Sequence, residues 1–163
     1  IALFQEAAKS NPRSASIQNA FGAVLEASGN IPLALESYRK AVRWEPRSAT
    51  YHFNLARLLA QTGNVPAAIE HYEKAVHLKE AFGPAQANLG TLLLKSGKVD
   101  EALMHLNKAA TLIPNNPNLH VQAAIALMSL GRKAEASEQL EKALALNPRH
   151  EQAREYLDRL LAH

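Results

Sequence analysis

The sequence predicts an all-α chain built from stacked helical hairpins. Thirty of the 163 residues are Ala, which loses no side-chain entropy in a helix. No stretch of strict apolar and polar alternation is long enough to predict a strand. Residues of one kind also recur every 34 residues along almost the whole chain, as in a repeat protein.

The 34-residue period is carried by small, large apolar and turn-forming residues. Small residues recur in three series, Gly recurs where a turn is expected, and an aromatic or Leu residue recurs between two of the Ala series. A Pro series has one gap, where Glu80 stands. The series are Gly22, Ala56, Gly90, Ala124; Gly29, Gly63, Gly97, Gly131; Ala34, Ala68, Ala102, Ala136; Tyr38, Tyr72, Leu106, Leu140; Ala41, Ala75, Ala109, Ala143; and Pro12, Pro46, Pro114, Pro148.

The period divides the chain into four full segments, 15–48, 49–82, 83–116 and 117–150, each predicted to form two helices. In the first segment, Ser14 and Asn30 are the expected N-caps and Pro32 lies in the first turn of the second helix. Gly29 ends the first helix, since Gly readily adopts the left-handed conformation of a C-cap. The small residue on the first helix lets the two helices approach closely, and stacked hairpins then share one core.

The two ends differ from the full segments. Residues 1–14 match the second helix of a truncated repeat, so we expect further repeats upstream in a longer parent chain. Residues 151–163 match a first helix, but Asp158 occupies the close-approach position, where a second helix could not pack over a carboxylate. We therefore predict a capping helix there, with Glu155 and Arg159 as an i,i+4 ion pair.

The spacing of Gly22, Gly29, Ala34, Tyr38, Ala41 and Pro46 resembles that of the tetratricopeptide repeat (TPR) family. The resemblance implies a right-handed superhelical α-α solenoid of four full repeats, with a partial repeat before them and a capping helix after them. It also implies that the first helices line a concave groove. Leu106 and Leu140 depart from the family pattern, in which an aromatic residue stands at that position.

Composition excludes several functions. The chain has no Cys, and its net charge of +3 comes from basic and acidic residues that are mixed along the sequence. Nucleic-acid binding is therefore not expected, because it needs a clustered basic stripe. The longest apolar run, residues 123–128, is far below the roughly 20 residues that span a bilayer.

No motif predicts catalysis, a cofactor or a metal. There is no Gly-rich phosphate loop, since every Gly but Gly83 has a packing or turn role in the repeat. None of the seven His lies at i,i+3 or i,i+4 from another, so we interpret them as surface or interhelix residues. The basic residues Arg39, Lys40, Arg43 and Arg47 are expected to form a solvated face, and Trp44 to pack in the core.

The resemblance implies that the concave groove binds a peptide, with Asn54, Asn88 and Gln122 in equivalent positions on three first helices. Such carboxamides could bond the backbone of an extended peptide without reading its sequence. Arg57 and Lys95 would meet carboxylates, and Val121 and Ile125 would form an apolar floor. The full set of predicted peptide-binding residues is Asn19, Phe53, Asn54, Arg57, Asn88, Thr91, Lys95, Val121, Gln122, Ile125 and Tyr156.

The leading functional hypothesis is a protein-protein interaction scaffold that binds an extended peptide or a partner helix. The carboxylate clamp of chaperone-binding family members is largely missing, since only Asn54 matches it, so we do not expect a chaperone C-terminus as the partner. Two alternatives stay open: self-association through the exposed N-terminal face, and a recognition arm of a larger enzyme such as a glycosyltransferase. The absence of Cys leaves the compartment open, and we favour the cytoplasm over the periplasm.

Overall fold

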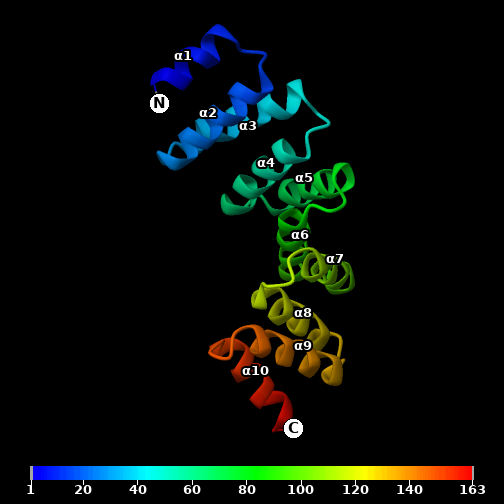
Figure 1. Ribbon diagram of the computed structural model, residues 1–163. Helices are drawn as coiled ribbons and strands as arrows, with labels where there is room; N and C mark the ends of the chain where they lie inside the picture. The colour runs from blue at the N-terminus through cyan, green and yellow to red at the C-terminus, as the bar shows by residue number, and fades with distance from the viewer. Residues whose placement is uncertain (1, 163) are drawn as a thin grey trace. The chain divides into compact units, whose positions relative to one another are not determined.

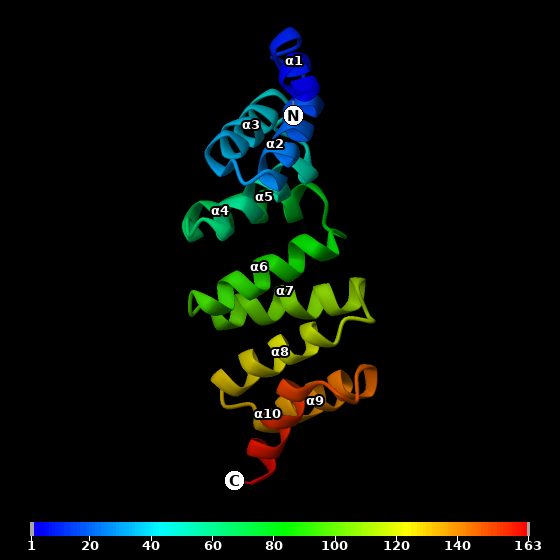
Figure 2. The same cartoon turned by 90° about the vertical axis from the view of Figure 1, so that its left-hand side faces the viewer.

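The computed structural model describes residues 2–162, so the outermost residues of the first and last predicted segments, Ile1 and His163, lie outside it. Within this range the chain forms ten α-helices and no strand. Figures 1 and 2 show how the helices follow one another along the chain. The helices group into two units, residues 1–80 and 81–163. The all-α solenoid fold predicted from the period is confirmed.

The first unit holds one single helix and two hairpins. Helix α2 packs against α3 and α4 packs against α5, while α1 contacts α2 and α3 contacts α4 (Figure 1). The bounds are α1 Ala2–Ser10, α2 Ala15–Ala27, α3 Ile31–Trp44, α4 Ala49–Gln61 and α5 Val65–Leu78.

The second unit holds two hairpins and a last helix. Helix α6 packs against α7, α8 packs against α9, and α10 packs on α9 (Figure 2). Asp158 is exposed on α10, and Arg159 pairs with Glu155 at 2.5 Å as predicted. The bounds are α6 Gly83–Lys95, α7 Val99–Leu112, α8 Pro117–Ser129, α9 Lys133–Leu146 and α10 Glu151–Leu161.

Turn chemistry fixes the helix ends. The Gly residue between the two helices of each hairpin has φ between +73° and +83°, the left-handed conformation that a side chain disfavours. The Ser14 hydroxyl accepts a hydrogen bond from the Ile17 backbone N–H at 3.4 Å, as expected for an N-cap. Asn30 is the N-cap of α3, as predicted, but its side chain makes no capping hydrogen bond; the side chain of Asn64, its equivalent, accepts one from Ala67 N.

In two hairpins the helices approach closely at the Gly of the first helix, and Ala56 and Ala124 are fully buried at the same position in the other two. A Cβ atom added to Gly22 would lie 2.8 Å from the Tyr38 ring, and one added to Gly90 would lie 2.8 Å from Leu106 Cγ. Gly83 also packs closely, because its Cβ would lie 2.7 Å from Ile113 Cγ1. Gly83, the one glycine to which the repeat pattern gave no packing role, is therefore a packing residue as well.

Replacing Gly90 with Leu should damage the second unit. The added side chain would meet Leu106 and the Ala102 carbonyl oxygen at 3.1 Å, and a backbone atom cannot move aside cheaply. Overpacking of this kind costs about 1–3 kcal/mol of unfolding free energy. Chemical denaturation measures the loss, and Lys95→Leu on the exposed side of the same helix is the control. Equal stability of the two variants would contradict the close-approach argument.

Candidate functional site

In the first unit, neighbouring first helices bring two of the predicted carboxamides together. Asn54 on α4 donates its Nδ2 hydrogen to Asn19 Oδ1 on α2, with 2.8 Å between the two atoms. Both side chains are half-buried. This bond uses one donor and one acceptor of the pair, so Asn19 Nδ2 and Asn54 Oδ1 lie outside it. We call the surface formed by α2 and α4 the first-helix face of this unit.

Arg57, predicted to meet a ligand carboxylate, is paired within the chain. Its guanidinium donates two hydrogen bonds, of 2.5 and 2.6 Å, to the two carboxylate oxygens of Glu26 on α2. The Tyr38 hydroxyl donates a third bond to Glu26 Oε2 at 2.9 Å. The charge of Arg57 is thus matched by a carboxylate that is itself mostly buried.

The pKa values of these three groups follow from the pairing. The hydrogen bonds from Arg57 lower the pKa of Glu26, although burial opposes the shift. Burial raises the pKa of Tyr38 to about 12, and its hydrogen bond to Glu26 adds to the rise. Glu26 therefore stays ionised and Tyr38 stays neutral over the physiological range, which ties α2 to both α3 and α4.

Phe53, also predicted to line the groove, is half-buried on α4. Its ring contacts the ring of Tyr72 on α5, with centroids 5.9 Å apart and planes tilted by 58°. This is a favourable geometry for an aromatic pair. The contact fixes the orientation of Phe53 and leaves part of its surface accessible.

In the second unit, the predicted residues differ in what they offer to a partner. Val121 is only 1% exposed and belongs to the apolar core, so its prediction as groove floor is wrong. Ile125 and Tyr156 pack against the same core but are only half-buried. The other four predicted residues of this unit retain accessible surface: Asn88, Thr91 and Gln122 are half-buried, and Lys95 is exposed.

One feature of the hairpins was missed from the sequence: a polar pair across each of the last three hairpins, 19 residues apart. His52 Nδ1 lies 2.9 Å from His71 Nδ1, His105 Nδ1 lies 2.6 Å from Gln86 Oε1, and His120 Nδ1 lies 2.8 Å from Gln139 Oε1. The 34-residue period contains the signal, since the first members lie at residues 52, 86 and 120. The second members lie at residues 71, 105 and 139, so the pairing becomes visible only when the two series of positions are aligned.

The tautomers of the His52 and His71 pair follow from a third contact. His52 Nε2 lies 3.0 Å from the Pro46 carbonyl oxygen, which can only accept, so this nitrogen carries the proton. Nδ1 of neutral His52 is therefore bare and accepts the hydrogen of His71 Nδ1. Burial lowers the pKa of both rings, and that of His71 falls to about 4.

No group of three His, Asp or Glu side chains in residues 2–162 could hold a metal ion, and the His52 and His71 pair supplies two ligands at most. No helix in this range is long and apolar enough to cross a membrane.

The prediction that Trp44 packs in the core is wrong. It is 42% exposed, and the guanidinium carbons of Arg13 and Arg43 lie 5.5 and 5.7 Å from its ring centroid.

Family models of the tetratricopeptide repeat match residues 1–44, 19–85 and 93–160 of the chain. The chain belongs to the tetratricopeptide repeat family. The TPR fold is typical of non-catalytic scaffolds for protein-protein interaction, and TPR proteins bind protein partners. A comparison with curated proteins finds no significant match.

Solved structures with the same fold include MamA, at 22% identity and a TM-score of 0.83, over 89% of this chain and 85% of that one. The pilF protein of Pseudomonas aeruginosa is 24% identical, with a TM-score of 0.77, over 94% of this chain and 70% of that one. The Cut9-Hcn1 complex of APC/C is 23% identical, with a TM-score of 0.80, over 98% of this chain and 32% of that one. At these identities, the similarity establishes the fold alone.

Acid should destabilise the His52 and His71 pair. The unfolded chain binds a proton at His71 near the ordinary pKa of 6.5, whereas the folded chain binds it only near pH 4, so stability is lost as the pH falls through this window. Because His71 is half-exposed, we expect a loss of about 1–2 kcal/mol. Denaturation curves at a series of pH values measure it.

The control is His71→Gln, which copies the His120 and Gln139 pair of the fourth hairpin and removes one titrating ring. The stability of this variant should depend less on pH between 6.5 and 4. An unchanged pH dependence would show that the pair does not cause the loss.

Proposed function

We propose that this TPR protein binds an extended peptide through the carboxamides of its first helices, which lie on the first-helix face of the first unit and on α6 and α8 of the second. The observation that carries the proposal is the Asn19 and Asn54 contact, in which two neighbouring first helices present half-exposed carboxamides side by side. A carboxamide offers both a donor and an acceptor, as a peptide backbone does. The first-helix face is thus suited to a backbone whose side chains vary.

The predicted residues would make different kinds of contact with the peptide, according to their side chains. Carboxamides would bond the peptide backbone, the accessible parts of Phe53, Ile125 and Tyr156 would contact apolar side chains, and exposed Lys95 would meet a carboxylate. Arg57 instead supports the face from within, since Glu26 already matches its charge. The residues proposed to contact the peptide are Asn19, Phe53, Asn54, Asn88, Thr91, Lys95, Gln122, Ile125 and Tyr156.

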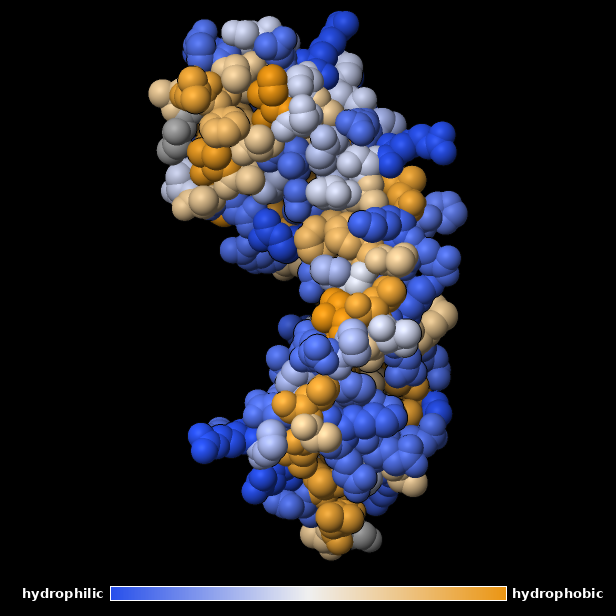
Figure 3. All heavy atoms as spheres, in the orientation of Figure 1, coloured by the Kyte–Doolittle hydropathy of each residue, from blue (hydrophilic) through white to orange (hydrophobic). Residues whose placement is uncertain are grey.

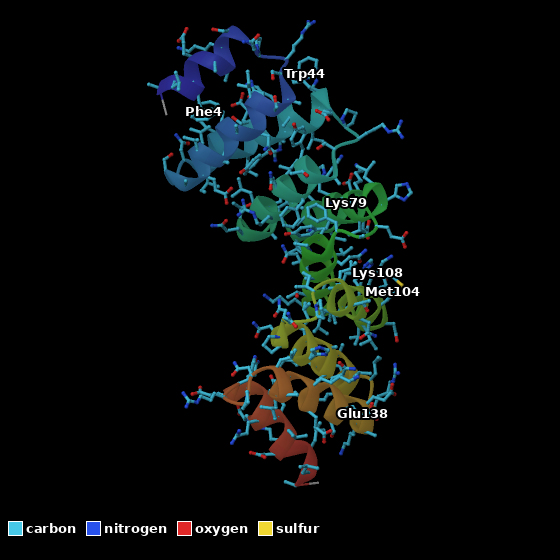
Figure 4. All side chains as sticks on the ribbon, in the orientation of Figure 1. Phe4, Trp44, Lys79, Met104, Lys108 and Glu138 are labelled. Carbon is cyan, nitrogen blue, oxygen red and sulfur yellow. The ribbon has the colours of Figure 1, made fainter. Side chains whose placement is uncertain are left out.

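Self-association through α1 is a second candidate function. Leu3 is 81% exposed and Phe4 is 37% exposed on this helix. Figure 3 shows apolar residues gathered around α1 in that view, and Figure 4 labels Phe4 there. Light scattering over a concentration series tests it: growth of the molar mass, abolished by Leu3→Lys, supports self-association, whereas a constant monomer mass excludes it.

The test of peptide binding starts from a random peptide library selected on the immobilised 163-residue chain. A selected peptide should bind the double variant Asn54→Ala and Asn88→Ala more weakly by about 1–3 kcal/mol, because the hydrogen bonds of the two amides are lost. Calorimetric titration measures the affinity. Circular dichroism checks the fold, since Asn54→Ala also removes the bond to Asn19.

The matched control is Glu73→Gln with Glu138→Gln, two exposed positions on second helices. Its affinity for the selected peptide should equal that of the unmodified chain. Selection of no peptide, or equal binding by the double Asn variant, would contradict the proposal.

A further inference from the structure

The first unit contains a pocket lined by residues of its first three helices. It has a volume of about 510 Å³ and lies between α1 and α3, with α2 as its floor. Neither Asn19 nor Asn54 lines it, so the pocket is distinct from the contact that carries the proposed peptide site.

A short side chain, Ser37, lines the pocket at a position where the later hairpins carry longer ones. Positions 34, 68 and 102 residues further along the chain hold His71, His105 and Gln139, and each of these longer side chains reaches across its hairpin to a partner on the first helix. Ser37 cannot span that distance. Its potential partner Gln18 instead donates to the Pro12 carbonyl oxygen at 3.4 Å.

A smaller pocket in the second unit has Gln139, a longer side chain, at the position equivalent to Ser37. It has a volume of about 260 Å³, and its lining residues include Ala110, His120, Gln139 and Lys142. They lie three periods after Ala8, Gln18, Ser37 and Lys40 of the large pocket. The same notch thus recurs between second helices, and it is about half as large where Gln139 replaces Ser37.

The large pocket combines an apolar wall with a basic rim. Ala8, Phe21, Leu33 and Trp44 line it, and Figure 4 places Trp44 at the C-terminal end of α3. The charged residues that line it are three cations and one carboxylate: Lys9, Lys40, Arg43 and Glu36.

The charges at the rim do not balance. Glu36 is paired with Lys40 at 2.6 Å, so two positive charges of the lining exceed the negative ones. Arg13, which lies over the Trp44 ring, adds another cation beside them. The complementary ligand is therefore apolar at its centre and negative on both sides.

We propose that this pocket is a second binding site, which takes an aromatic side chain from an acidic segment of a partner protein. The aromatic ring would bury itself in this apolar lining, and acidic residues on either side would meet Lys9, Arg13 and Arg43. An aromatic anchor gains most in such a pocket, since it buries about 150–250 Å² and stacks on other rings. The charges favour encounter with an acidic segment over a basic one.

The single Trp of the chain reports on this pocket directly. Titration with the blocked pentapeptide Asp-Glu-Phe-Glu-Asp should change Trp44 fluorescence in a saturable manner, and added salt should weaken the binding. The peptides Asp-Glu-Ala-Glu-Asp, without the anchor, and Lys-Lys-Phe-Lys-Lys, with reversed charge, should bind at least tenfold more weakly. Absence of saturable binding by the first peptide, or equal binding by all three, would overturn the proposal.

Two variants test the position of the site. Ser37→His introduces the residue that His71 and His105 already show to fit a hairpin. It should narrow the pocket, as Gln139 does in the smaller notch, and weaken binding of the first peptide at least tenfold. Arg43→Glu should weaken this binding without narrowing the pocket. Gln139→Ser, the reciprocal change in the smaller notch, should leave the affinity for the first peptide unchanged. Unchanged binding by both Ser37→His and Arg43→Glu would contradict the site.

Discussion

The close approach of the two helices in each hairpin is the constraint on which the rest of the structure depends. Where Gly22 faces the Tyr38 ring, even one added carbon would lie within 2.8 Å of it. This distance lets Ala34, Tyr38 and Ala41 become completely buried and leaves the opposite sides of the helices for other contacts. The close approach gives each hairpin a dense contact between its two helices. Stacking of neighbouring hairpins completes the core, which one hairpin of this size could not form alone.

Polar contacts also join the helices, and the residues that make them differ from hairpin to hairpin. No buried side-chain nitrogen or oxygen in residues 2–162 lacks a partner. The Glu26 and Arg57 pair ties two neighbouring first helices, while the His52 and His71 pair ties a first helix to its second. Where one member of such a pair is short, as at Ser37, the packing leaves a pocket instead.

The sequence predicted the fold well because the period depends on backbone geometry and residue size, and both can be read from single positions. It predicted the site less well. Val121 looked accessible by analogy, but the core of the second unit covers it, and Arg57 looked free because Glu26 lies 31 residues away. Trp44 was assigned to the core because helical position alone does not show that α1 leaves a notch there. The exposure and pairing of these side chains depend on contacts between helices, which the residue types along one 34-residue series do not show.

The proposals give this chain two kinds of binding surface: carboxamides on first helices and a basic-rimmed notch between second helices. Nuclear magnetic resonance of the isotope-labelled chain, titrated with a library-selected peptide, tests the first of these surfaces. We expect the side-chain amide signals of Asn54 and Asn88 to shift together with backbone signals of α4 and α6. Shifts confined to the second helices, or no shifts, would contradict the proposed peptide site.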